Sequence, residues 1–170
     1  MGIIEGVTAE ILNHAGVPSA GTDEVQTLTI DASGGTFKLA FEGFITSAIS
    51  WSATNNTLRD NVDTALEALP SIGTGGITTA VGTMTNGVGT LTLTFAGNRG
   101  KQAIGSLVTV ANNSLTGTAT LSIAETTPGV DATFRGAPKG QLVVDTTNGK
   151  LYINTGTALA PTWTVVGTQS

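Results

Sequence analysis

Hydrophobic and polar residues alternate along much of this chain, which is the pattern of β-strands with one buried face. Residues 25–30 and 36–41 both alternate, and the turn-forming residues 33–35 lie between them. These runs predict a β-hairpin, and residues 44–51 predict a third strand after it. The side chains predicted to face the core from these runs are Phe37, Leu39, Phe41, Ile45, Ile49 and Trp51.

The period changes between residues 55 and 69, where apolar side chains recur every three or four positions. This spacing predicts one amphipathic helix of about four turns. Thr54 or Asn56 can cap its start, and Pro70 ends it because proline cannot continue a helix. The apolar positions of this helix are Leu58, Val62, Ala65, Leu66 and Leu69.

Strand patterns resume after the helix at residues 77–81, 90–95, 107–110 and 118–124, with a predicted turn at Asn112–Ser114. A lone helix among antiparallel strands has to pack across an open sheet face. The sequence therefore predicts a mainly β (α+β) fold, in which residues 25–127 form an antiparallel β-sandwich-like domain with one amphipathic helix.

Residues 128–170 predict a small C-terminal three-stranded β module, with strands at 141–145, 151–154 and 162–166. Asn148-Gly149 is a strong hairpin signal between the first two. The module has too few large apolar residues for a core of its own, so we expect it to pack on another surface and to supply an oligomer contact. The predicted contact residues are Leu142, Val144, Leu151, Tyr152, Ile153 and Trp163.

The first 24 residues predict an N-terminal arm and linker, with residues 18–22 separating the arm from the first strand. The arm is more apolar than a solvated tail needs to be, so we expect it to dock on a partner and to become ordered mainly on binding. The predicted docking residues are Ile3, Ile4, Val7, Ile11, Leu12 and Val17.

The amino-acid composition of the chain disfavours several classes of function. Only 11% of the 170 residues are charged, and seven Lys and Arg against twelve Asp and Glu give a net charge of −5, which disfavours a nucleic-acid partner. Without cysteine, and with His14 as the single histidine, we expect no catalysis, cofactor or metal site. No signal peptide or membrane-spanning run is evident, so we expect synthesis in the host cytoplasm and no membrane partner.

Two stretches resemble proteins of tailed-bacteriophage virions. Residues 136–157, closing with 161–167, are similar to a short β module of head-decoration, head-fibre and tail-fibre proteins. Residues 23–41 with the helix at 58–69 are similar to a domain that recurs in minor capsid and other virion structural proteins. The chain thus resembles the head decoration and minor capsid, or head-fibre-like, virion proteins.

This resemblance implies a non-enzymatic virion protein. We expect a capsid decoration (cement) protein that binds the major capsid protein on the outer surface of the head, and the resemblance also implies a homotrimer. A tail or head fibre that adsorbs to the host is the first alternative, although these residues contain no long repetitive shaft. The second is an immunoglobulin-like module binding a host surface glycan through Trp51, Tyr152 or Trp163, of which the strand pattern assigns Trp51 to the core.

Overall fold

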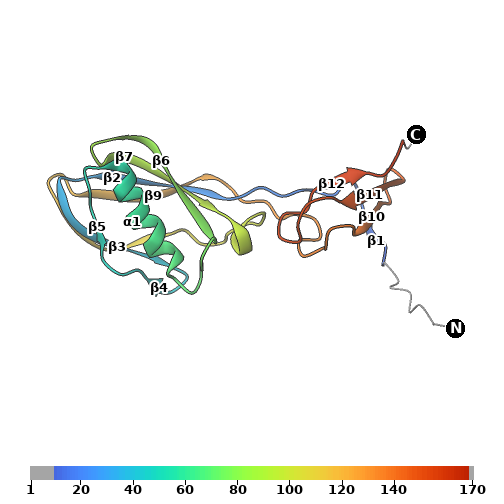
Figure 1. Ribbon diagram of the computed structural model, residues 1–170, viewed down its shortest axis with the longest axis horizontal. Coiled ribbons are helices and arrows are strands. Elements are labelled where there is room, and N and C mark those ends of the chain that lie inside the picture. The colour runs from blue at the N-terminus through green and yellow to red at the C-terminus, as the bar shows by residue number, and fades with distance from the viewer. Residues whose placement is uncertain (1–9, 169–170) are drawn as a thin grey trace. The chain divides into compact units, whose positions relative to one another are not determined.

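The computed structural model describes residues 10–168 and divides the chain into two compact units (Figure 1). We call residues 22–130 the central unit, and residues 10–21 together with 131–168 the terminal unit. The terminal unit therefore contains both a segment before the central unit and a segment after it. In the predicted division residues 1–24 stood apart from residues 128–170, whereas the structure joins the described parts of these two segments.

A long two-stranded ribbon is the frame of the central unit. Strands β2 (Val25–Asp31) and β3 (Gly34–Phe41) follow one another along the chain and pair antiparallel with β9 (Thr120–Thr127) and β8 (Thr109–Thr116), respectively. Pairing continues through the bend, where the Ser33 N–H donates to the Thr116 carbonyl oxygen at 2.8 Å. The predicted hairpin between β2 and β3 is therefore wrong: residues 33–35 form a corner, and the two strands belong to different sheets.

Each half of the ribbon is widened into a sheet. The first sheet has the order β6-β7-β2-β9, with β6 at Ile77–Thr85 and β7 at Val88–Phe95. In the second, β3 pairs with β8 on one side and with β4 (Phe44–Ile45) and β5 (Ile49–Ser50) on the other. A 3₁₀ turn, η1 (Gly97–Arg99), follows β7.

Helix α1 (Asn55–Glu67) completes the core of the central unit. Its side chains Leu58, Val62 and Leu66 are fully buried with residues of both sheets, as the three- and four-residue spacing predicts. Thr54 takes the N-cap position but makes no side-chain capping hydrogen bond. The predicted mainly β, sandwich-like α+β fold with one helix is confirmed. The largest fully buried side chains are Phe37, Phe41, Phe95, Leu28, Ile30, Leu39, Ile49, Leu58, Leu66, Ile77, Leu91 and Leu93.

Two details of the central unit differ from the sequence pattern. Ile45 is 61% exposed, because the predicted third strand is interrupted at Thr46, whose hydroxyl accepts the N–H of Leu39. The predicted turn at Asn112–Ser114 lies instead inside β8, where Asn113 pairs opposite Phe37. The chain turns only after Thr116, because β8 has to run the length of β3.

The terminal unit is one four-stranded sheet of order β1-β10-β11-β12. Its strands are β1 (Leu12–His14), β10 (Leu142–Asp145), β11 (Lys150–Asn154) and β12 (Trp163–Val165). The hairpin predicted at Asn148-Gly149 is confirmed by the β10–β11 pairing. The sequence did not predict β1. This part of the predicted arm forms a strand that pairs parallel with β10.

One face of the terminal sheet is covered from within its own unit. Val143 and Tyr152 are buried there, and the ring of Phe134, in the loop before β10, contacts the sheet through two aromatic neighbours. That ring makes edge contacts with Trp163, at 6.4 Å between centroids, and with His14, at 5.9 Å. Residues 131–168 thus share this small core with the N-terminal segment, which pairs with β10 and contacts Phe134 through His14, and the expected oligomer contact stays a prediction.

Candidate interaction surface

The two faces of the terminal sheet differ in what covers them. Residues directly opposite one another on neighbouring strands lie on the same face, and successive residues alternate between faces. Leu12, Val143 and Tyr152 are in register across three strands and belong to the covered face. The neighbouring positions form the opposite face. We call these residues the apolar face: Ile11, Leu142, Val144, Leu151, Ile153 and Val166.

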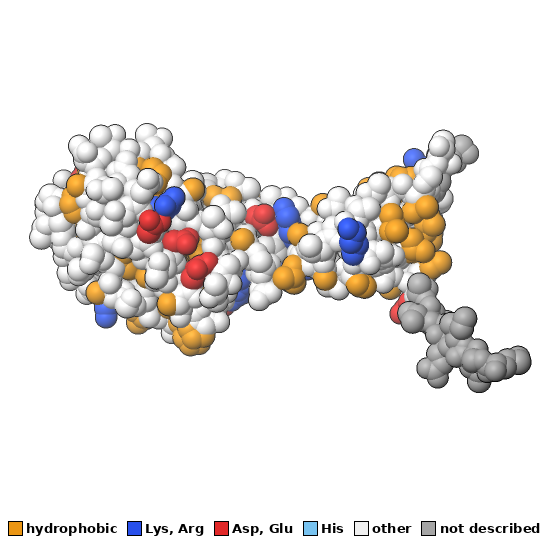
Figure 2. Space-filling view, in the orientation of Figure 1, with side chains coloured by type: hydrophobic (Ala, Val, Ile, Leu, Met, Phe, Trp, Pro, Cys, Tyr) orange, Lys and Arg blue, Asp and Glu red, His pale blue; other side chains and the backbone are white. Residues whose placement is uncertain are grey.

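The apolar face is partly open to solvent in the described structure. Ile11 is 50% exposed and Val166 36% exposed, and the four residues on β10 and β11 are partly exposed. Figure 2 shows hydrophobic side chains gathered on the surface of this unit. The polar residues on the same face, Asn13 and Thr164, are uncharged. A contiguous apolar surface without charge is typical of a protein–protein contact.

The predicted oligomer-contact residues separate between the two faces. Leu142, Val144, Leu151 and Ile153 lie together on the apolar face, as their alternation predicts. Tyr152 is only 5% exposed and lies on the covered face, so its side chain offers almost no surface to a partner.

Trp163 also belongs to the covered face. It is partly buried, and its indole N–H donates to the Thr133 carbonyl oxygen at 3.2 Å. The aromatic residues therefore hold the terminal unit together, whereas the aliphatic ones face outward.

The predicted docking residues of the arm are also dispersed. Ile3, Ile4 and Val7 lie outside the described residues. Leu12 is part of β1 and half-buried, whereas Ile11 joins the apolar face and Val17 is 62% exposed. Ile11, a predicted docking residue, therefore lies on the same face as four of the predicted oligomer-contact residues. The sequence did not predict this, because the pattern gave no sign that the arm pairs with β10.

Asp145 fastens the N-terminal segment to the β10–β11 turn. Its carboxylate accepts hydrogen bonds from the Gly16 N–H at 3.0 Å, the Thr147 N–H at 2.9 Å and the Asn148 N–H at 3.0 Å. The Asn148 side-chain amide donates a fourth bond at 2.7 Å. Burial alone raises the pKa of Asp145, but the hydrogen bonds from Asn148, Thr147 and Gly16 outweigh it and hold the pKa below the usual value.

This depressed pKa predicts a loss of stability in acid. A carboxyl group with a lower pKa in the folded than in the unfolded state stabilises the fold above its unfolded pKa of about 3.9. The contribution is lost as the pH falls through the folded-state pKa. We expect Asp145→Asn to lower the melting temperature of the terminal unit at pH 7, and the difference from wild type to shrink below about pH 4. Calorimetry across pH 2–7 measures this, and a difference independent of pH would contradict it.

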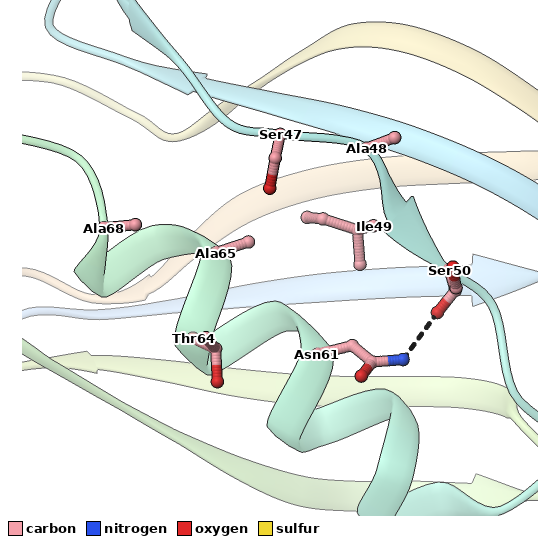
Figure 3. A pocket seen from close by; sticks show the side chains of 8 residues that line it. All are labelled: Ser47, Ala48, Ile49, Ser50, Asn61, Thr64, Ala65 and Ala68. Carbon is pink, nitrogen blue, oxygen red and sulfur yellow. Dashed lines mark hydrogen bonds between the residues drawn. The ribbon is translucent and has the colours of Figure 1, made fainter.

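A shallow pocket of about 260 Å³ lies beside helix α1 in the central unit (Figure 3). Asn61 and Thr64 approach it from the helix and Ile49 from β5. Its lining contains no charged or aromatic side chain. The pocket therefore offers neither an acid–base pair nor a ring for sugar stacking. The complete lining is Ser47, Ala48, Ile49, Ser50, Asn61, Thr64, Ala65 and Ala68.

Residues 10–168 contain neither a metal-binding cluster nor a membrane-spanning helix. No group of three or more His, Cys, Asp or Glu side chains is placed to hold a metal ion in this range. Among the described helices, none is both long and apolar enough to cross a membrane.

Comparison with known proteins gives one distant similarity. No family model and no curated protein matches the chain. A solved structure from Mycobacterium phage Patience is similar over 85% of this chain and 55% of that chain, with 14% sequence identity and a TM-score of 0.41. The chain thus spans about half the length of that phage protein. A similarity at this level establishes neither a shared fold nor a shared function.

Proposed function

We propose that this protein is a non-enzymatic structural component of a bacteriophage virion that decorates the outer surface of the head. The observation that carries the proposal is the apolar face, a partly exposed hydrophobic surface on a small unit of a charge-poor chain. Such a surface favours a permanent protein contact, because burying it removes apolar area from water without desolvating a charge.

The composition supports a multi-copy assembly role. Contacts repeated many times on a lattice are costly when long charged side chains have to be ordered, at up to about 2 kcal/mol each. This chain has only seven Lys and Arg in 170 residues, and threonine and glycine predominate among its other polar and small residues. The resemblance of residues 136–157 to the β module of head-decoration proteins favours the same role.

The apolar face is the proposed self-contact, in a homotrimer whose threefold symmetry suits a threefold site of a capsid. A closed cyclic assembly buries such a face without leading to open-ended aggregation. The proposed contact with the major capsid protein remains with the N-terminal arm. Its residues Ile3, Ile4 and Val7 lie outside the described residues, and Val17 is exposed.

The glycan-binding alternative is less well supported, because all three aromatic rings that it needs are engaged. Tyr152 is buried, and Trp163 packs on Phe134. Trp51 is partly buried against the core, and its indole N–H donates to the Gly87 carbonyl oxygen at 3.1 Å. A sugar ring would need one of these faces to be free.

Copy number in purified virions tests the decoration role. A decoration protein is expected in hundreds of copies and on the head, whereas an adsorption fibre is expected in few copies at a fibre site. Quantitative mass spectrometry against the major capsid protein, with immunogold labelling of particles, distinguishes the two. Absence of the protein from virions would contradict both assignments.

Substituting one residue of the apolar face tests the self-contact. We expect Leu151→Lys to lower the mass in analytical ultracentrifugation to one third of the wild-type value, because it places a charge in a contact that excludes water. Thr147→Lys is the matched control, since Thr147 is exposed in the β10–β11 turn and away from the apolar face. An unchanged mass for Leu151→Lys would assign the self-contact to another surface.

A further inference from the structure

Two of the sheet edges in the central unit are capped by side chains of helix α1. On β6, the Asp63 carboxylate accepts the Thr79 N–H at 2.7 Å, and the Asn55 amide donates to the Met84 carbonyl oxygen at 3.0 Å. On β5, the Asn61 amide donates to the Ser50 carbonyl oxygen at 2.9 Å, which Figure 3 shows as a dashed line. These bonds satisfy edge groups that could otherwise pair with another strand.

The edge formed by β8 is protected from pairing with another strand in a different way. Its pairing with β3 is interrupted by a register shift between Lys38 and Leu39, which bends the strand. The side-chain oxygen of Asn113 also accepts the Leu115 N–H at 3.1 Å. An incoming strand would meet an irregular edge with an occupied donor.

Within residues 10–168, the edge formed by β9 has neither kind of protection. β9 is the terminal strand of its sheet, and its register with β2 is regular from Thr120 to Glu125. This stretch contains no lysine, arginine or proline, the residues that commonly block an edge, and Glu125 is its only charge. Leu121 and Ile123 are partly exposed while packing against the core.

The hydrogen-bonding direction of β9 follows from its neighbours. The N–H and C=O of one strand residue point to the same edge, and successive residues alternate. The Phe95 N–H donates to the Glu24 carbonyl oxygen at 2.9 Å, so even-numbered residues of β2 face β7 and odd-numbered ones face β9. Thr29 is opposite Ser122, so Ser122 bonds back to β2. Leu121, Ile123 and Glu125 therefore direct their backbone groups to the open edge.

We propose that the β9 edge pairs antiparallel with β9 of a second copy of this chain, about a twofold axis through Ser122. In this register Leu121 lies opposite Ile123 of the other copy, and each of these two pairs exchanges two N–H···O bonds. The two copies would then join their four-stranded sheets into one continuous sheet, with apolar side chains meeting on the core side.

The neighbouring registers are less favourable. A shift that centres the axis on Ile123 places Leu121 opposite Glu125 and sets a carboxylate against an apolar side chain. A shift that centres it on Leu121 requires pairing by Ala119, whose carbonyl oxygen already accepts the Asn113 amide and whose φ of 55° is not that of a strand. The register centred on Ser122 is therefore the most favourable, because it places apolar side chains opposite each other and keeps the two Glu125 carboxylates apart. This self-complementary pattern indicates a second copy of the chain as the partner.

A charge at the axis tests the contact. Ser122 is exposed on the outer face of the sheet, so Ser122→Lys keeps the fold but sets two ammonium groups directly opposite each other across the twofold. We expect analytical ultracentrifugation of the full chain to show half the wild-type mass for this variant. Thr78→Lys, an exposed threonine on the α1-capped β6 edge, is the control and is expected to keep the wild-type mass.

Cysteine substitution tests the register. The wild-type chain has no cysteine, so Ser122→Cys introduces a single thiol. Opposite residues of a non-hydrogen-bonded pair have Cα atoms about 4.5 Å apart, within the range of a disulfide. We expect Ser122→Cys to form a covalent dimer under mild oxidation, at least ten times faster than Thr78→Cys.

Two results would overturn the proposal. One is an unchanged mass for Ser122→Lys, and the other is a crosslinking rate for Ser122→Cys no greater than that of Thr78→Cys. The proposed threefold contact through the apolar face is tested separately, because Leu151→Lys changes the terminal unit and leaves β9 intact. A chain that lacks the threefold contact but has the β9 contact is a dimer that Ser122→Lys converts to a monomer.

Discussion

Replacing Tyr152 by alanine is expected to unfold the terminal unit while the central unit stays folded. Tyr152 is the largest buried side chain of this small sheet, and removing a buried aromatic side chain costs about 3–5 kcal/mol. A unit of this size has little stability in reserve. Hydrogen exchange measured by mass spectrometry should show rapid exchange in β10 and β11, with β2 and β7 still protected.

The adjacent residue supplies the control. Leu151 lies on the apolar face and is partly exposed within its own unit, so Leu151→Ala should reduce hydrogen-exchange protection of the sheet far less than Tyr152→Ala does. Equal loss of protection in the two variants would show that the faces of the sheet are assigned the wrong way round. Protection of β10 and β11 in Tyr152→Ala would show that the terminal unit does not depend on this core.

Replacing Gly35 by alanine is expected to be the most damaging change in the bent ribbon. Gly35 has a φ of +89°, and an added Cβ would lie 2.3 Å from the Ser114 carbonyl oxygen and 2.8 Å from the Leu115 Cα atom. Both are backbone atoms of the paired strand, so they can move only if the pairing opens. We expect a loss of about 3 kcal/mol or more, from backbone strain and steric overlap together, in urea unfolding of the central unit.

Substituting Gly43 distinguishes the effect of backbone strain from that of steric overlap. Gly43 has a similar φ of +84°, but an added Cβ would meet no atom within 4 Å. Gly43→Ala should therefore cost only the backbone strain, about 1 kcal/mol. If both substitutions destabilise the central unit equally, the close approach of Gly35 to β8 is not what makes glycine necessary there.

Periodicity identified most of the elements of this fold. Alternation placed Phe37, Leu39 and Phe41 on one buried face, and the change of period located helix α1 to within two residues at its end. These features are local, since each follows from the side-chain spacing of one strand or one helix. The β10–β11 hairpin was predictable for the same reason, because Asn-Gly fits the tight turn that joins two such strands.

Pairing between distant segments could not be predicted in this way. Residues 33–35 have the composition of a hairpin turn, but β2 and β3 pair instead with β9 and β8, about 70 to 100 residues later in the chain. Gly35 is required there by the backbone of β8 and not by a turn. β1 could not be predicted, because a strand of three residues is too short to show alternation.

The apolar face was only partly predictable from the sequence. Alternation separated Leu151 from Tyr152, but it could not decide which of the two faces the terminal unit covers. That depends on the loop carrying Phe134 and on the N-terminal segment held by Asp145. Ile11 joined the face only because β1 lies beside β10.

The position of the terminal unit at both ends of the described chain determines how the protein carries mechanical load. β1 and β12 are the two outer strands of the terminal sheet and run in the same direction, since β1 is parallel to β10 and two antiparallel pairings separate β10 from β12. A pull that separates residues 10 and 168 therefore acts in opposite directions along these strands and loads the sheet in shear, in which many hydrogen bonds resist together. The central unit lies outside this path, and its two ends are held together by the paired hydrogen bonds between Thr22 and Val130. Tension applied between residues 10 and 168 would reach the central unit only after the terminal sheet had come apart.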